Sequence, residues 1–154
     1  MTSEIKNAQS VSLRSAEPAD LRAVLTLLDR AHLPTAGATD PVTHFVVAEA
    51  GGRIVGAVGL ELYGASALLR SAAVEESWQG CGVGRALIDR ALDVAKERGI
   101  EDVFLLTTTA EHYFPRFGFA CVSRESVKPA VQESVEFREA CPASAVVMRK
   151  SLKE

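Results

Sequence analysis

Residues 69–92 constrain the fold of this chain more than any other stretch. A short apolar run ends at Val74, three glycines follow within residues 79–84, and an amphipathic pattern continues to Leu92. This order predicts a strand, a loop and a helix. Because glycines leave backbone N–H groups accessible and the N-terminus of a helix is electropositive, such a loop is suited to bind phosphate groups.

Two common phosphate-binding loops do not match this one. No Lys-Ser or Lys-Thr pair follows Gly84, as a Walker A loop requires, and the glycine spacing differs from that of the dinucleotide-binding fingerprint. What remains is the pattern Gln-x-x-Gly-x-Gly behind an apolar strand. By itself this pattern leaves open which phosphate compound is bound.

Composition and charge limit the kinds of molecule that this chain is expected to bind. The chain has 154 residues and a formal net charge of −3, which suits one domain with a sizeable core. No basic run could follow a nucleic-acid backbone, and this argues against nucleic-acid binding. No apolar run approaches the roughly 18 residues of a membrane span, so we expect no membrane contact and a cytoplasmic location. Cys81, Cys121 and Cys141 are widely spaced and predict reduced thiols, with no metal site.

Residues 11–154 are expected to form a single domain, preceded by a polar, flexible tail at residues 1–10. The order of elements predicts an α/β protein, with a central mixed sheet of six to seven strands and helices on both faces. Strands are expected at residues 11–14, 45–48, 53–62, 67–74, 102–106, 118–122 and 145–148. Helices are expected from Glu17 to Leu33, from the glycine loop to Gly99, and from a cap at Thr108 or Thr109 through Phe114 and Phe117.

With Gly118-Phe119 downstream, this pattern resembles the Gcn5-related N-acetyltransferase (GNAT) superfamily from Val11 to Leu152. The resemblance implies a GNAT-like fold and acetyl-CoA as cosubstrate, with its pyrophosphate on the loop and its pantetheine between two strands that splay apart. A backbone N–H near Ala72 would polarise the thioester carbonyl. The implied cosubstrate-binding residues are Ala72, Ala73, Val74, Gln79, Gly80, Cys81, Gly82, Val83, Gly84, Arg85, Thr107, Thr108 and Phe114.

Four blocks are similar to a narrower branch, the arsenic-resistance N-acetyltransferases. They are residues 59–64 (Gly-Leu-Glu-Leu-Tyr-Gly), 68–71 (Leu-Leu-Arg-Ser), 105–110 (Leu-Leu-Thr-Thr-Thr-Ala) and 141–145 (Cys-Pro-Ala-Ser-Ala). This resemblance implies a small primary amine as acceptor, of the phosphinothricin or arsinothricin type, and a link to arsenic or toxin resistance. A homodimer is left open.

Two charged strand residues are candidates for acceptor chemistry. Glu61 could take a proton from the substrate ammonium or bind it, or it could be a solvated or ion-paired strand residue. Arg70 lies in an apolar strand, where a charge is costly without a partner. It could bind an acceptor anion, or pair with Glu61 as a structural ion pair. Thr107 and Arg124 complete the expected substrate-binding set, and residues 124–142 are expected to cover the acceptor side.

The general acid is the weakest match to the family. GNAT members usually carry a Tyr four residues before the Gly-Phe pair, where this chain has Phe114. Tyr113 is one residue away, about 100° around a helix. Tyr113 turned inward, Tyr63, Ser71, a Thr or water could protonate the thiolate. A non-catalytic acyl-CoA-binding or metalloid-sensing domain on the same scaffold is the alternative to an enzyme.

Overall fold

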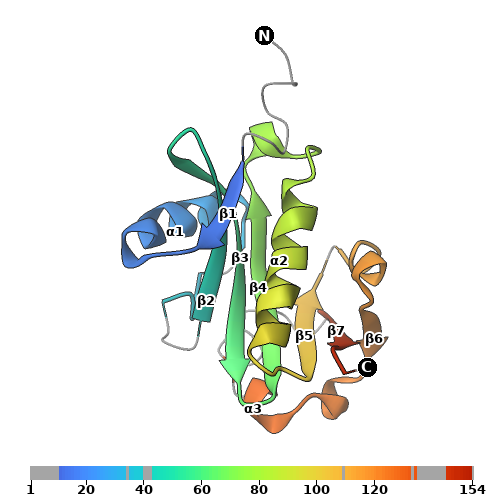
Figure 1. Cartoon of the computed structure of the whole chain (residues 1–154). Coiled ribbons are helices and arrows are strands. Elements are labelled where there is room, and N and C mark those ends of the chain that lie inside the picture. Colours follow the sequence, from blue (N-terminus) through green and yellow to red (C-terminus); the bar gives the residue numbers. More distant parts are fainter. Residues whose placement is uncertain are drawn as a thin grey trace.

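The computed structural model describes residues 11–33, 35–39, 43–108, 110–132, 134 and 145–153. Its centre is a seven-stranded mixed sheet in the order β1-β2-β3-β4-β5-β7-β6 (Figure 1). The predicted fold class is therefore confirmed. The strands are β1 (Ser12–Ser15), β2 (Thr43–Ala50), β3 (Arg53–Tyr63), β4 (Ser66–Val74), β5 (Asp102–Thr107), β6 (Ala120–Val122) and β7 (Val146–Ser151). The helices are α1 (Leu21–Arg30), α2 (Val83–Glu97) and α3 (Pro129–Gln132), with short 3-10 turns η3 (Pro18–Asp20), η4 (Glu76–Trp78), η5 (Phe114–Phe117) and η6 (Arg124–Ser126).

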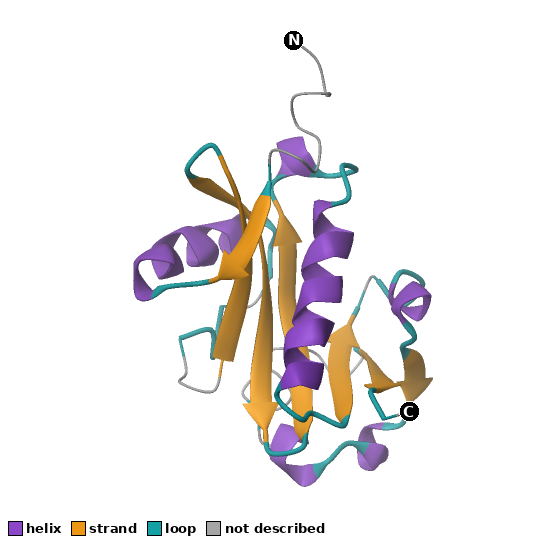
Figure 2. Cartoon of the chain, viewed as in Figure 1, coloured by secondary structure: helices purple, strands orange, loops and turns teal. Residues whose placement is uncertain are grey.

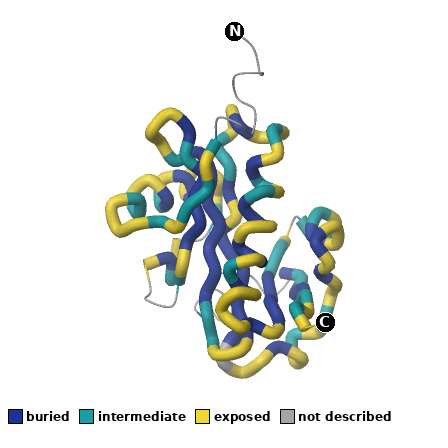
Figure 3. Tube along the Cα trace, viewed as in Figure 1, coloured by how far each residue is buried: buried dark blue, intermediate teal, exposed yellow. Residues whose placement is uncertain are grey.

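The first four strands form an antiparallel meander, and helices cover both of its faces (Figure 2). On one face α1 packs Val24, Leu27 and Leu28 into a cluster with residues of β2, β3 and β4. On the other face α2 buries Leu87 and Ile88 among a larger set. The central strands β2, β3 and β4 between these helices are mostly buried, whereas β1 is not (Figure 3).

Gly56 lets α2 approach β3 closely. A Cβ at this position would lie 2.9 Å from Leu87 Cδ1, closer than real Cβ atoms come, and 3.2 Å from Val83 Cγ1, which is tighter than most real contacts. The first turn of α2 is therefore seated directly on β3. This contact fixes where the glycine loop lies relative to the sheet.

The second half of the sheet is joined to the first by a very short ladder. β4 and β5 run parallel and pair only at Ser66–Leu68 with Asp102–Phe104. Beyond this, β5 continues its pairing with β7 alone, to Thr107. A third cluster, formed by Val127 and Val131 with residues of β4, β5 and β7, lets α3 cover the face of this half that lies opposite α2.

Several predicted boundaries differ from the structure. The short helix near Phe114 is a 3-10 turn that starts after Tyr113, without a side-chain cap. Thr107, not Thr108, accepts the local hydrogen bond, from the Ala110 N–H at 2.9 Å. Thr109 and the predicted tail, residues 1–10, lie outside the described residues. None of the helices in the described ranges is long and apolar enough to cross a membrane.

Candidate active site

The glycine loop has the conformation that an anion site needs. Gly80 and Gly82 adopt positive φ values of 81° and 86°, and a Cβ on either would meet nothing within 4 Å. Gly82 is the N-cap of α2 and has no side chain to cap it. The first-turn N–H groups of this 15-residue helix therefore receive no side-chain cap from the N-cap residue. Gln79 steadies the loop, because its Nε2 donates to the Val74 carbonyl at 3.0 Å.

The space beside this loop is bounded by β4, after its pairing with β5 has ended. Ala72 is exposed, although Ser71 and Ala73 on either side of it are buried. Across from it, Thr107 is half-buried and Thr108 is exposed at the end of β5. The early end of the β4–β5 ladder agrees with the splayed strands that the family resemblance implies. The part of β4 beyond Leu68 therefore has no ladder partner in β5 among the described residues.

A β-bulge interrupts β4 at this point. The ladder between β3 and β4 passes from Ala57↔Ala73 to Gly59↔Arg70, so two residues of β4, Ser71 and Ala72, oppose Val58 alone. Ser71 has a φ of 60°, in the left-handed region that favours glycine. The register shift lies between Ala57 and Gly59 of β3, and nothing in the sequence marks Ser71.

A buried hydrogen-bonded chain connects this bulge to β3. Arg70 Nη1 donates to Glu61 Oε2 at 2.7 Å, and their side chains are 0% and 2% exposed. Arg70 Nε donates to Ser71 Oγ at 2.9 Å. The Tyr63 hydroxyl donates to the other Glu61 oxygen. Of the two alternatives for Arg70, the structure shows the ion pair with Glu61.

The aromatic residues after β5 lie beside the loop. Phe114 is buried and packs its ring against Phe119, with a 5.8 Å centroid separation. Tyr113 is half-buried, and its hydroxyl oxygen lies 3.8 Å from where a Cβ on Gly84 would be. Tyr113 thus points its hydroxyl toward the start of α2, while the Phe114 ring fills the core.

The acceptor-side candidates are only partly visible. Arg124 is half-buried, and its Nη2 donates to the Ala145 carbonyl at 3.4 Å. Of the predicted acceptor cover at residues 124–142, residues 133 and 135–142 lie outside the described residues. At the opposite end of β5, Asp102 accepts a 2.6 Å hydrogen bond from Ser66 Oγ and lies 3.5 Å from Lys128 Nζ. Sequence reasoning missed this carboxylate, which links η6–α3 to the sheet.

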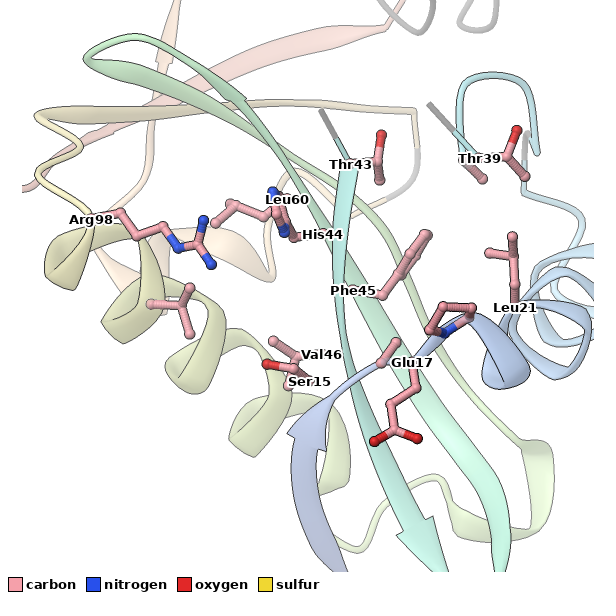
Figure 4. Close-up of a pocket in the computed structure, with 14 residues that line it drawn as sticks. Ser15, Glu17, Leu21, Thr39, Thr43, His44, Phe45, Val46, Leu60 and Arg98 are labelled. Carbon is pink, nitrogen blue, oxygen red and sulfur yellow. The ribbon is translucent and has the colours of Figure 1, made fainter. Parts of the chain in front are cut away.

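Other reactive side chains do not gather in the described ranges. Cys81 is half-buried and Cys121 is exposed, while Cys141 lies outside the described residues. No group of three or more His, Cys, Asp or Glu side chains in the described part of the chain could hold a metal ion. A pocket at the β2 edge is lined by His44, Phe45 and Arg98 among others (Figure 4), but by none of the predicted site residues. Burial and the charge of Arg98 lower the pKa of His44 there.

Comparison with known proteins identifies this arrangement. The family model described as an acetyltransferase (GNAT) domain matches residues 41–121, just over half of the chain. The chain belongs to the GNAT acetyltransferase family. The matched region runs from the residues just before β2 through the glycine loop to β6, so it includes the bulge and the splayed strands.

Individual GNAT proteins extend the comparison. The chain is 33% identical over 85 residues to an uncharacterized N-acetyltransferase of Chlorobaculum tepidum, covering 54% of each chain. It is 38% identical over 69 residues to an amino-acid acetyltransferase of Mycobacterium tuberculosis, covering 44% of this chain and 39% of that one. It thus spans about half or less of the length of these curated relatives. The crystal structure of Rv2747 from M. tuberculosis in complex with CoA has a TM-score of 0.77 and 25% identity, over 92% of this chain and 99% of that one.

Proposed function

We propose that this GNAT domain is an acetyl-CoA-dependent N-acetyltransferase that acts on the primary amine of a small, amino-acid-like molecule. The observation that carries the proposal is the glycine loop at the start of α2, beside the place where β4 leaves β5. An anion site and an accessible strand backbone, side by side, suit a ligand with a pyrophosphate and an extended amide chain. The solved GNAT structure with CoA supports this choice of cosubstrate.

In this proposal the loop from Gln79 to Arg85 holds the pyrophosphate through its backbone N–H groups. The pantetheine amides lie along Ala72–Val74 on one side, and Thr107, Thr108 and Phe114 line the other. Because a Cβ on Gly80 or Gly82 would meet open space, the loop leaves room for the phosphates. Bound acetyl-CoA would supply the activated acetyl group.

The reaction balances with residues of this chain in three roles. The acceptor nitrogen attacks the thioester carbon, a C–N bond forms, the C–S bond breaks, and the electron pair leaves with the CoA thiolate. Glu61, directly or through water, takes the first proton that the ammonium group must lose before its nitrogen attacks. The second proton leaves the nitrogen to water as the C–S bond breaks, and water in turn restores the proton that the donor gives to the thiolate. The Ala72 N–H stabilises the oxyanion that develops on the carbonyl. Tyr113, whose hydroxyl points toward the start of α2, is the side chain we propose as proton donor to the thiolate.

The acceptor class rests on two lines of support. The M. tuberculosis relative is named an amino-acid acetyltransferase. The four blocks that resemble the arsenic-resistance branch favour an amino acid with an anionic side group, such as phosphinothricin or arsinothricin, and a role in toxin resistance. Arg124 and Thr107 are the residues we propose at the anionic end of the acceptor.

A second candidate function is acyl-CoA binding without turnover. Phe114 favours it, because a buried phenyl ring at the position of the usual acid has no proton to give. Thiols have pKa values near 8.5, so the CoA thiolate is nevertheless a tolerable leaving group near neutral pH. For this reason we place catalysis first.

Thiol release from acetyl-CoA, measured with a panel of amino acids and analogues that includes phosphinothricin, tests both candidates. We expect turnover with at least one acceptor and a drop of about 10²–10⁴-fold in kcat/KM for Glu61→Gln. Glu101→Gln, an exposed carboxylate at the far end of the sheet, is the matched control and should be unchanged. Tight CoA binding without thiol release by the wild type would favour the second candidate.

A further inference from the structure

Ser71 adopts a backbone conformation that its own side chain disfavours. A φ of 60° in a non-glycine residue costs on the order of 1–3 kcal/mol and persists only where the surroundings impose it. Bulges of this kind commonly have glycine at the left-handed position. Something around Ser71 must therefore hold it there.

The guanidinium of Arg70 is hydrogen-bonded both to Ser71 and to Glu61, and it can therefore hold Ser71 in this conformation. Its Nε donates to Ser71 Oγ at 2.9 Å, and its Nη1 donates to Glu61 Oε2 at 2.7 Å. Glu61 is oriented in turn by the Tyr63 hydroxyl. The side chain of Arg70 has no exposed surface, so this geometry is imposed by the core rather than by solvent-exposed contacts.

Gly59 makes room for this arrangement. It lies opposite Arg70 in the ladder, and a Cβ there would come within 3.1 Å of Arg70 Cγ and 3.0 Å of Phe45 Cε1. β3 thus has no side chain at Gly59, where the aliphatic part of the Arg70 side chain crosses the strand. Arg70, its partners Glu61 and Ser71, and the space left by Gly59 therefore form one connected structural unit.

We propose that Arg70 is a positioning residue: it holds Ser71 in the left-handed conformation and so aims the Ala72 N–H at the thioester carbonyl. The inference rests on the proposed acetyl transfer. It assigns Arg70 a role different from binding an acceptor anion, because its guanidinium is already engaged by Glu61 and Ser71. Glu61 then contributes twice, as proton acceptor and as the anchor of Arg70.

A matched pair of substitutions at Ser71 isolates the backbone effect. Ser71→Gly and Ser71→Ala both remove the hydroxyl, but only glycine adopts positive φ without strain. We expect Ser71→Ala to lower kcat by up to about 10²–10³-fold, the loss typical of removing one oxyanion donor, and Ser71→Gly to lower it far less. The KM for acetyl-CoA should change little in either, because the pyrophosphate loop is intact. Equal losses in both variants would overturn the proposal, since the hydroxyl itself would then matter.

A double-mutant cycle tests Arg70 itself. Arg70→Met should lower kcat in the wild-type background and have a much smaller effect in the Ser71→Gly background, because glycine needs no arginine to hold its φ. An equal effect in both backgrounds, expressed as a raised KM for the acceptor, would make Arg70 an acceptor anchor and contradict the proposal.

A measurement without turnover separates this inference from the proposed function. The three-bond HN–Hα coupling of Ser71 reports its φ in solution, with or without bound CoA. We expect Arg70→Met to shift this coupling away from the left-handed value, and Arg70→Lys, which keeps a donor, to shift it less. An unchanged coupling in Arg70→Met would refute the positioning role even if the wild type turned over no acceptor. Absence of turnover together with a shifted coupling would refute only the proposed function.

Discussion

Two ion-paired networks in this protein do different work. At the exposed edge, Arg14 joins Asp20 at 2.7 Å and Glu49 at 3.0 Å, with all three side chains 14–34% exposed. In the middle of the sheet, Arg70 joins Glu61 at 2.7 Å with almost no exposure. The distances are alike, so the difference in burial decides what each network contributes.

Burial changes both the cost and the use of a charge pair. An exposed pair is screened by water and salt and contributes about 0–1 kcal/mol. A buried pair must offset the loss of hydration, and breaking it leaves an uncompensated charge in the core. The Arg14 network ties the turn before α1 to β1 and β2. The Arg70 network shapes the strand that we propose as the acetyl-transfer site.

The largest effect is expected from breaking the buried pair on one side. Arg70→Met should lower the free energy of unfolding by about 3–5 kcal/mol, because Glu61 is left charged and unpaired. The double variant Glu61→Gln/Arg70→Met should recover part of this loss. Urea denaturation followed by circular dichroism measures both. A loss below about 1 kcal/mol in the single variant would mean that this pair behaves like an exposed one.

The ion pairs of Asp102 join a buried carboxylate to more exposed cations and are intermediate between the Arg14 and Arg70 networks, so replacing Asp102 should have an intermediate effect on stability. Its side chain is 4% exposed, while its partners Lys128 and Arg149 are 54% and 39% exposed. Burial raises the pKa of Asp102, but the Ser66 hydrogen bond and the two cations outweigh it and leave the pKa lowered. Asp102→Asn should therefore cost about 1–3 kcal/mol at neutral pH.

The pH dependence provides a further check on Asp102. Because the folded pKa is lowered, the charged form stabilises the fold above the ordinary aspartate pKa, and this contribution is lost as pH falls. The difference in unfolding free energy between wild type and Asp102→Asn should become smaller as the pH falls. Its exposed neighbour Glu101 serves as control, and Glu101→Gln should have a smaller effect at every pH.

The smallest effect is expected at the exposed network. The hydrogen bonds from Arg14 and from the Glu17 N–H lower the pKa of Asp20 from 3.8 to about 2. Asp20→Asn should lower stability by less than about 1 kcal/mol near neutral pH, and less still in high salt. The pKa of Asp20 is lower in the folded than in the unfolded state. The stability difference between wild type and Asp20→Asn is therefore present above about pH 4 and is lost toward pH 2. Thermal melts across this range measure it, and a salt-independent loss of several kcal/mol would contradict the comparison.

The features readable from the sequence are those with a local signal. Glycines marked the loop at residues 79–84, and apolar runs or apolar–polar alternation indicated the strands. The bulge at Ser71 had no such signal, because a serine gives no sign of positive φ and the cause lies in Arg70 and Glu61. The Asp102 contacts join residues 36 and 47 positions apart in the chain, which no local pattern reveals.

The predicted cap at Thr108 was wrong for a related reason, and its alternative, Thr109, lies outside the described residues. Thr107 closes the turn by accepting from the Ala110 N–H, and Pro115 then sits in the first turn of η5 without a side-chain cap. The choice between neighbouring threonines depends on where β5 stops pairing with β7. That register is a property of the sheet rather than of the segment.

The most direct test of the central claim is to follow the acetyl group itself. Wild-type protein is incubated with acetyl-CoA labelled with ¹³C in the acetyl carbonyl and with an amino-acid acceptor, and the products are followed by NMR. We predict that the label appears in an amide on the acceptor nitrogen, with one free CoA formed for each amide. Label that stays in bound acetyl-CoA, with no amide formed from any amine tested, would contradict the account.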